Sequence, residues 1–201
     1  MNIQNTISAL ERKGYTARFF ETGAEAVAYL ERAIEGKVIG FGGSWTLYAL
    51  KLHEVLGRKN TVIDPDYPDD GREFEEVALD TVRTQHYMLS ANAMSEDGVI
   101  VNLDGHCNRI AGSVFGHEKI WYVIGTNKIV PSLEDAIWRT RNVAAPKNAR
   151  FLKRKTPCAV KGDRCYDCSS PDRICSGLLI NLQKTGSAEV EVILINEELG
   201  Y

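Results

Sequence analysis

The sequence predicts an α/β fold, in which a mostly parallel sheet carries helices on both faces and is followed by a cysteine-rich loop and a C-terminal β-hairpin. Apolar residues alternate along the chain between helical spacing and the short runs typical of buried strands. Glycines and capping residues separate these segments. Repeated alternation of strand and helix is typical of a parallel sheet covered by helices on two sides.

The first half of the chain alternates between predicted helices and predicted strands. Thr22 and Glu25 have the spacing of a capping box, and Gly36 is placed to end the helix that they begin. We expect helices over residues 3–14, 22–36, 44–57 and 74–82, strands over 15–20, 37–41, 61–63 and 86–89, and a turn over 65–70.

The middle of the chain changes character but keeps both kinds of element. Val99–Leu103 and Ile120–Gly125 are rich in apolar and β-forming residues and are predicted strands. Ser132 has the position of a helix N-cap just after a proline. Pro146 is expected to stop or kink the helix that Ser132 begins.

The C-terminal part is expected to end in paired strands. Residues 178–182 and 190–195 are separated by a polar segment and are predicted to form the hairpin. The chain has no internal repeat and no low-complexity tract. We therefore expect a single domain over 1–201, with the cysteine-rich segment 153–176 inside it.

Composition and charge exclude several classes of protein. The 201 residues are 44% hydrophobic and 25% charged, which is typical of a globular protein. A formal net charge of −3 provides no basic field for nucleic acid or for an anionic membrane. The sequence shows no signal peptide pattern and no long apolar run. We therefore expect a cytoplasmic protein without a membrane span.

Four of the five cysteines form a C-x6-C-x2-C-x6-C array near the end of the chain. Two thiolates separated by two residues can wrap one metal ion, and the outer pair can complete a tetrahedral shell. Zinc and a [4Fe–4S] cluster both accept four thiolates. The alternatives are incidental cysteines in a loop, or a redox-active pair formed by the inner two alone. The predicted metal ligands are Cys158, Cys165, Cys168 and Cys175.

A glycine-rich turn joins the predicted strand 37–41 to the helix that follows it. Glycines let a ligand approach the backbone without meeting Cβ atoms, and free N–H groups at a helix N-terminus favour an anion. The turn is not the dinucleotide-binding fingerprint, because Trp45 stands where glycine would be needed. Plain packing is the alternative. The candidate phosphate- or carboxylate-binding residues here are Gly40, Gly42, Gly43 and Ser44.

Polar residues also follow two other predicted strands. If these strands lie parallel in one sheet, their loops meet at its carboxyl edge, where open α/β sheets bind ligands. Arg109 and Lys128 would supply positive charge, and Asp104 could transfer a proton or bind a hydroxyl group. The alternative is that Asp104 and Asn108 only shape a turn. The candidates in these loops are Asp104, Asn108, Arg109, Asn127 and Lys128.

From about Val38 onward, the chain resembles the LUD (lactate-utilisation) family. The motifs that carry the resemblance are residues 40–46, 96–98, 104–105, 108–109, 125, 127–128, 141–146 and 148–149. The tail, over residues 165–168 and 170–175, resembles a short cysteine-containing subgroup. The resemblance implies a fold like that of ribose-5-phosphate isomerase and the CoA transferases. In such relatives the glycine turn contacts phosphate or CoA, which points to Gly42, Gly43 and Ser44.

The resemblance also implies a link to the oxidation of L-lactate to pyruvate, where family members work beside iron–sulfur partner proteins. It supplies no catalytic residues, and Glu96 is only a positional candidate for the glutamate of the CoA transferases. Cys107 departs from the pattern, since a small residue is expected at that place in the loop. The resemblance and the exposed sheet edges are compatible with a homodimer.

Three functions follow from these observations. The first is an accessory or electron-transfer component of lactate oxidation that binds a small anionic metabolite. The second is an isomerase- or transferase-type enzyme that acts on a phosphorylated or CoA-linked small molecule and carries a structural metal. The third is a non-catalytic module that senses a metabolite. The sequence leaves open whether the protein is an enzyme.

Overall fold

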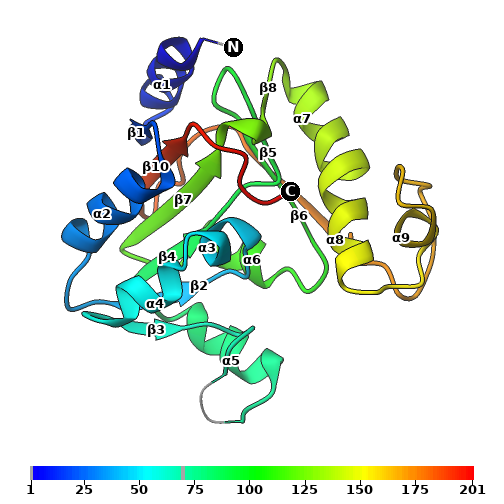
Figure 1. Cartoon of the computed structure of the whole chain (residues 1–201), viewed down its shortest axis with the longest axis horizontal. Helices are drawn as coiled ribbons and strands as arrows, with labels where there is room; N and C mark the ends of the chain where they lie inside the picture. The colour runs from blue at the N-terminus through cyan, green and yellow to red at the C-terminus, as the bar shows by residue number, and fades with distance from the viewer. Residues whose placement is uncertain (1, 69–70) are drawn as a thin grey trace.

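The computed structural model describes residues 2–68 and 71–201, and it confirms the predicted α/β class (Figure 1). Within these ranges, six strands form a wholly parallel sheet in the order β1-β10-β7-β4-β2-β3. The expected turn over 65–70 includes two residues outside the described ranges. The strands are β1 (Thr16–Phe20), β2 (Val38–Phe41), β3 (Thr61–Ile63), β4 (His86–Leu89), β7 (Lys119–Gly125) and β10 (Glu189–Ile195).

A second, four-stranded sheet lies beside the first, in the order β8-β5-β6-β9. In it, β6 pairs antiparallel with both β5 and β9, whereas β5 and β8 are parallel. Strand β5 was not predicted from the sequence, because three residues are too few to show the apolar alternation of a strand. The strands of this sheet are β5 (Ala93–Ser95), β6 (Ile100–Asp104), β8 (Ile129–Val130) and β9 (Gly177–Asn181).

The predicted C-terminal hairpin is wrong. Strand β9 pairs with β6 in the small sheet, and β10 lies between β1 and β7 in the parallel sheet. Six of the seven residues of β10 are buried. A strand buried on both faces belongs in the centre of a parallel sheet rather than in an exposed hairpin. The polar segment between β9 and β10 is therefore a crossing from one sheet to the other.

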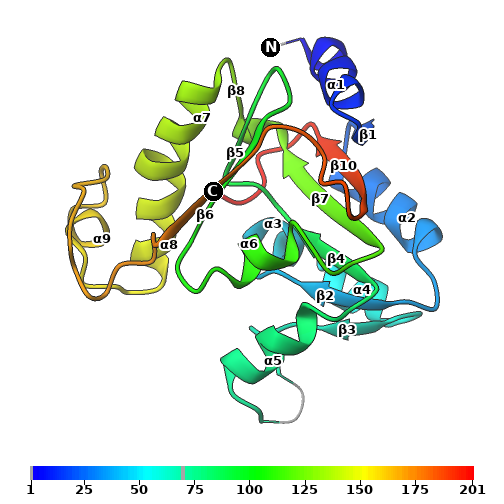
Figure 2. The same cartoon turned by 180° about the vertical axis from the view of Figure 1, so that it is seen from behind.

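Each face of the parallel sheet packs into its own core (Figures 1 and 2). Helices α2 (Gly23–Ala33), α3 (Trp45–Ala49) and α4 (Leu52–Gly57) cover one face, where Leu30 and Leu47 pack with Trp121. Helix α1 (Ile3–Arg12) and the small sheet cover the other face, where Leu10 and Ile100 pack with Tyr122. The predicted capping box of α2 is present.

The single helix predicted over 44–57 is in fact two short helices. Lys51 adopts a left-handed conformation with φ of +51°, which interrupts the helical path between α3 and α4. Ser44 is the N-cap residue of α3, as predicted, but its side chain forms no capping hydrogen bond. This break leaves α3 as a short helix whose first residues face the site described below.

The helix that begins after Ser132 continues past Pro146 instead of stopping there. Helix α7 (Leu133–Arg139) passes into a π-helical turn, η2 (Thr140–Ala144), and then into α8 (Ala145–Phe151). Pro146 lies in the first turn of α8, directly after the π-helical turn, and the helical path continues through it. Ala136 of α7 packs on the small sheet.

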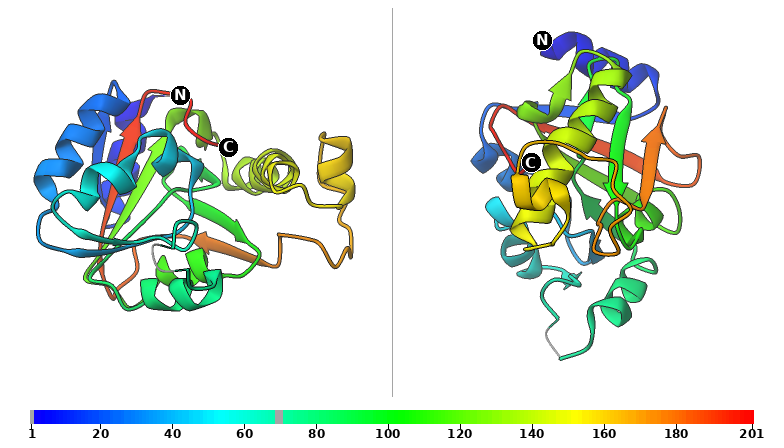
Figure 3. Two further views of the ribbon diagram at one scale, coloured as in Figure 1. Left: turned by 60° about the horizontal axis from the view of Figure 1, so that its bottom comes forward. Right: turned by 90° about the vertical axis from the view of Figure 1, so that its right-hand side faces the viewer.

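The remaining helices are short, and they flank the sheets or extend beyond them. They are α5 (Phe74–Thr81), α6 (Asn108–Gly112), the 3-10 turn η1 (Thr126–Lys128) and α9 (Pro157–Lys161). Figure 3 shows α9 and the cysteine-rich loop beside α8, projecting away from both sheets. In the ranges described, no helix is long and apolar enough to cross a membrane.

Candidate functional site

A cavity of about 910 Å³ opens at the carboxyl edge of the parallel sheet. Its walls include residues that directly follow β2, β4 and β7, where open α/β sheets bind ligands. Helix α8, the loop after β6 and the C-terminal residue Tyr201 also line the cavity. Further lining residues come from 66–67 and 74–75 and, in the cysteine-rich segment, from 154 and 171–174. The topology therefore brings together segments that lie far apart in the sequence.

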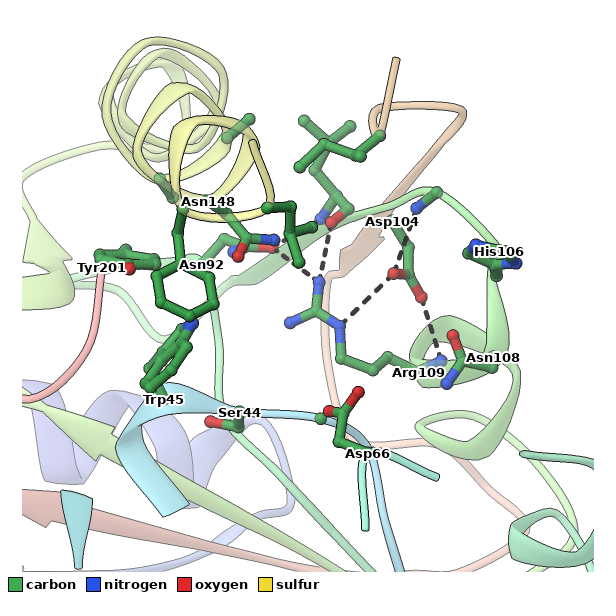
Figure 4. A pocket seen from close by; sticks show the side chains of 18 of the residues that line it. Ser44, Trp45, Asp66, Asn92, Asp104, His106, Asn108, Arg109, Asn148 and Tyr201 are labelled. Atoms are coloured by element: carbon green, nitrogen blue, oxygen red, sulfur yellow. Dashed lines mark hydrogen bonds and ion pairs between the residues drawn. The ribbon is translucent and has the colours of Figure 1, made fainter. Parts of the chain in front are cut away.

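Arg109 lies at the centre of this cavity (Figure 4). Its Nη2 donates to the main-chain oxygen of Leu103 at 2.8 Å and to Oδ1 of Asn92 at 3.3 Å. Its Nε lies 3.5 Å from Oδ1 of Asp104. Nη1 has no hydrogen-bond partner in the described part of the chain, and Figure 4 shows this nitrogen pointing towards the Trp45 side. The protein thus holds the guanidinium through Nη2 and Nε, and the two N–H groups of Nη1 are left for a ligand.

Asp104 organises the loop that carries Arg109. Its carboxylate accepts backbone N–H groups of Gly105 at 3.2 Å, Arg109 at 3.0 Å and Ile110 at 3.3 Å. The last two donors belong to the first turn of α6, so Asp104 satisfies donors that the short helix cannot satisfy itself. The carboxylate is therefore engaged by its own loop, and the predicted turn-shaping role of Asp104 is present alongside any role with a ligand.

Lys128 is a buried lysine in the same cavity, with 3% of its surface exposed. Its Nζ donates to Oγ1 of Thr46 at 2.8 Å and to Oγ of Ser90 at 3.0 Å. Burial, together with the positive charges of Arg139 and Arg109, lowers the pKa of Lys128 to about 7. Among the described residues, no carboxylate forms an ion pair with this amine.

Arg139 adds a third positive charge to this region. It is buried, its Nη1 donates to the main-chain oxygen of Asn92, and burial lowers its pKa. Asn92 therefore accepts hydrogen bonds from two guanidinium groups: its main-chain oxygen accepts from Arg139, and its side-chain oxygen accepts from Arg109. The segment after β4 is held by cations on two sides, which raises the positive potential near the cavity.

Aromatic rings form another wall of the cavity. The Trp45 ring lies 4.2 Å from that of Phe151 and 6.3 Å from that of Tyr201, measured between centroids. Tyr48 lies 5.9 Å from Trp45 and donates its hydroxyl to Asp66 at 2.7 Å. Figure 4 shows Trp45 and Tyr201 together on the side opposite Asp104. A ligand would therefore meet charge on one side and apolar surface on the other.

A carboxylate with an altered pKa lies behind this aromatic wall. Asp64 is buried, and burial raises its pKa to about 6, although a backbone N–H from Asp66 and the Tyr48 hydroxyl counteract this effect. Asp64 does not line the cavity, whereas Asp66 does.

The structure brings most of the predicted ligand-binding residues together. Six of them line the cavity, namely Gly43, Ser44, Asp104, Asn108, Arg109 and Lys128. Gly40 packs its backbone against Thr81 and Thr84 instead. Gly42 lies against Tyr87 and Arg109, where a Cβ would come within 3.0 Å of the arginine Cγ. Asn127 accepts the backbone N–H of Leu199 at 3.2 Å, and so holds the C-terminal tail rather than a ligand.

The route by which the loops meet differs from the predicted one. The strand expected at 99–103 is β6, which belongs to the small sheet and is antiparallel to its neighbours there. Its loop still reaches the cavity, because the small sheet packs against the face of the parallel sheet near that edge. The loops after β2 and β7 come from the parallel sheet, as predicted.

Several cavity residues were not predicted from the sequence. Trp45, Asn92, Asn148, Phe151 and Tyr201 line the cavity, and they come from four separate segments. Asn148 belongs to a motif that carried the family resemblance, which was the available signal. Trp45 also lies in such a motif, residues 40–46, but as an individual residue it was discussed only as a departure from a glycine pattern. The others follow no pattern that a single sequence reveals.

The four cysteines of the predicted metal site lie on the projecting segment. Cys158 is on α9, Cys165 and Cys168 are in the loop after it, and Cys175 precedes β9. Among the described residues, no group of three or more His, Cys, Asp or Glu side chains is placed to hold a metal ion. Cys165 Sγ does have polar donors nearby, with Arg141 Nη2 at 3.7 Å and Asp167 N at 3.4 Å. The metal site stays a prediction.

Cys107 lies outside the walls of the cavity. It precedes α6 in a left-handed conformation with φ of +63°. Its Sγ lies against Gly177, where a Cβ would come within 2.7 Å of the sulfur. Its neighbour His106 does line the cavity, with Nδ1 3.8 Å from a carboxylate oxygen of Glu75. Cys107 Sγ is therefore not among the groups that line this cavity.

The parallel sheet and the cation-bearing cavity at its carboxyl edge define an α/β protein of the open-sheet class. Within that class, the chain belongs to the LUD domain family, whose sequence model matches residues 3–195. Membership of this family associates the protein with lactate utilisation. The family match confirms the resemblance drawn from the motifs, and it extends to the first helix, which carried none of them.

A solved structure with a TM-score above 0.5 supports the fold. A DUF162 family protein from Deinococcus radiodurans is similar over 96% of this chain and 95% of its own, with a TM-score of 0.53 and 12% identity. A translation initiation factor eIF-2B from Pyrococcus horikoshii OT3 matches 56% of this chain and 49% of its own, with a TM-score of 0.39 and 18% identity. No curated protein matches the chain.

Proposed function

We propose that this LUD protein binds a small carboxylate or phosphate anion in the cavity, as an accessory or electron-transfer component in the oxidation of L-lactate to pyruvate. One observation carries the ligand-binding part of the proposal. Arg109 and Lys128 both face the cavity, and within the described residues the only carboxylate in ion-pairing distance of either is Asp104. The Arg109 guanidinium stays charged, and its Nη1 is left for an anionic ligand. Lys128, whose pKa is about 7, adds positive charge only where its amine is protonated.

The geometry favours recognition of a planar or tetrahedral anion. Nη1 of Arg109 has no protein partner among the described atoms, and a guanidinium binds carboxylate or phosphate oxygens through paired N–H groups. Ser44 lies in the same wall and could add a hydroxyl donor. The aromatic side of the cavity would contact the carbon skeleton of the ligand.

Isothermal titration calorimetry tests the binding. We expect L-lactate, pyruvate or inorganic phosphate to bind at millimolar or lower concentration, whereas glycerol, which is uncharged, does not. Arg109→Gln should weaken the binding by at least about tenfold, or about 1.4 kcal/mol. Arg58→Gln is the matched control, because Arg58 is exposed and lies outside the cavity. Absence of heat with all three anions would reject the proposal.

A second candidate function is favoured by the size of the cavity. About 910 Å³ is far more than a three-carbon acid needs and falls in the range of drug-sized ligands. An isomerase- or transferase-type enzyme acting on a phosphorylated or CoA-linked small molecule would use this volume. Titration with ribose 5-phosphate and with CoA separates the two candidates. Binding at least tenfold tighter than that of phosphate would favour the second, and equal or weaker binding would reject it.

The electron-transfer role depends on the cysteine segment and on a partner. We propose that Cys158, Cys165, Cys168 and Cys175 hold zinc or a [4Fe–4S] cluster, and that only the cluster would serve electron transfer. Exposed apolar side chains on α7 and α9, Trp138 and Val160, would supply contact area for an iron–sulfur protein or a second copy of this chain. Sedimentation velocity of the purified protein, alone and with such a partner, measures both associations.

A further inference from the structure

The amine of Lys128 has an unusual set of partners for a buried lysine. Its Nζ donates to two hydroxyl oxygens, Oγ1 of Thr46 at 2.8 Å and Oγ of Ser90 at 3.0 Å. A buried ammonium group is normally paired with a carboxylate, because isolated charge is costly to remove from water. Among the described residues, no carboxylate is paired with the Lys128 amine.

The number of partners fits a neutral amine. A neutral amine has two N–H groups and one lone pair, and the two hydroxyl oxygens accept both N–H groups. The lone pair is then free of any hydrogen bond. Burial and the charges of Arg139 and Arg109 favour this form, since they lower the pKa of Lys128 to about 7. A neutral amine in a cavity is a nucleophile for carbonyl carbon.

We propose that Lys128 is a covalent binding site for a small 2-oxo acid, whose carbonyl carbon it captures as a reversible imine. This inference rests on the proposed anion-binding function, because the carboxylate of the oxo acid would bind Arg109 while its carbonyl group reaches Lys128. Both side chains line the same cavity. A 2-hydroxy acid would bind through its carboxylate alone, since it offers no carbonyl carbon to the amine.

The reaction balances without an oxidant or a reductant. The lone pair of Nζ adds to the carbonyl carbon, and a proton passes from nitrogen to the carbonyl oxygen to give a carbinolamine. That hydroxyl then leaves as water, taking the remaining proton of the nitrogen, and a C=N double bond forms between the ligand and Lys128. The hydroxyl groups of Ser90 and Thr46, which already accept from Nζ, are placed to relay the proton. No electrons are transferred, and hydrolysis returns the free amine.

Borohydride trapping of the intact protein tests the proposal. Wild-type protein is incubated with pyruvate and sodium borohydride, which adds hydride to the imine carbon and fixes the adduct as a secondary amine. Peptide mapping by mass spectrometry then locates the modified lysine. We expect the adduct on Lys128 at a level at least tenfold above that on any exposed lysine. An adduct that is absent, or spread over exposed lysines, would overturn the proposal.

Variants and a second ligand make the result specific. Lys128→Met should abolish the labelling, whereas Lys147→Met should leave it unchanged, because Lys147 is an exposed residue of α8 outside the cavity. L-Lactate in place of pyruvate should give no adduct. If calorimetry shows that pyruvate binds but no adduct forms, the imine proposal is rejected and the anion-binding proposal stands. If an adduct forms on Lys128 but the protein binds neither phosphate nor lactate, the anion-binding proposal is rejected and the reactivity of the Lys128 amine is supported.

Discussion

Arg109 and Asp104 are joined twice, by side chain and by backbone. Nε of Arg109 lies 3.5 Å from Oδ1 of Asp104, and the backbone N–H of Arg109 donates to Oδ2 of the same carboxylate at 3.0 Å. Both side chains are largely buried. The carboxylate therefore fixes the start of α6 and the direction of the guanidinium together. Any substitution of Asp104 should disturb the fold of the loop as well as the cavity.

Asp104→Asn should lower the free energy of unfolding by about 1–3 kcal/mol, which is the usual penalty for leaving buried donors unsatisfied. An amide keeps one acceptor oxygen but turns an NH₂ group towards backbone N–H donors that the carboxylate now satisfies. Urea denaturation measures the change. Glu118→Gln is the control, because Glu118 is 64% exposed and its pair with Lys37 should contribute little. Equal stability of the two variants would contradict the role of Asp104.

Lys128→Met should stabilise the protein most at or below neutral pH. The pKa of Lys128 is about 7 in the folded chain, below its ordinary value of 10.5. Between these values the unfolded chain binds more protons, so the stability of the wild type rises with pH, by up to about 1.4 kcal/mol per pH unit. Below pH 7 the amine is charged in both states and the full penalty remains. The advantage of the variant should therefore shrink from pH 7 towards pH 10.

Denaturant titrations of wild type and Lys128→Met at pH 6.5, 8 and 9.5 measure this difference. The contributions of other titrating groups to stability are the same in both proteins and cancel in the difference. Lys147→Met provides the matched control and should show no such trend. A stability difference that stays constant with pH would mean that Lys128 is charged throughout and would remove the support for a neutral amine.

Trp45 should report ligand binding through its fluorescence. Its ring lines the cavity, while Trp121 is buried in the core and Trp138 is exposed on α7. Phosphate or L-lactate should change the emission of the wild type and of Trp138→Phe by the same amount, and the change should be lost in Trp45→Phe. A signal that follows Trp138 instead would place the ligand outside the cavity.

Cys168→Ser should lower bound metal and stability together, if the cysteine array holds an ion. Ligation energy contributes to folding, so loss of one thiolate weakens both. Metal analysis and thermal unfolding of anaerobically purified protein measure the two effects. Cys107→Ser is the control, because Cys107 lies outside the array. Unchanged metal content in Cys168→Ser, or metal-free wild type that folds normally, would reject the site.

The periodic part of the sequence was enough to predict the parallel sheet and its helices. Strands β2, β4 and β7 and helix α2 lie where apolar spacing and capping residues placed them. The hairpin failed because nearness in sequence was taken as nearness in space. Strand β10 is apolar on both faces and pairs with β1 and β7, which are distant in the chain. A single sequence contains no local signal for such pairing.

The charged part of the site was predictable, and its aromatic part was not. Lys128 follows a strand of the parallel sheet, where polar residues point to the carboxyl edge. Arg109 was expected in the same place, but it follows β6 of the small sheet and reaches the cavity from there. Tyr201 and Phe151 reach the cavity only through the packing of the tail and of α8, which depends on the whole fold. The partners of Lys128 were equally hidden, since Thr46 and Ser90 lie on separate segments.

Hydrogen–deuterium exchange with and without inorganic phosphate tests the central claim most directly, because it locates the anion on the backbone. We predict slower exchange for peptides covering residues 42–44 and 104–109 when phosphate is present, and no change for helix α4, which lies outside the cavity. Arg109→Gln should lose this protection. Unchanged exchange in both peptides at millimolar phosphate and at millimolar L-lactate would contradict an anion site in this cavity.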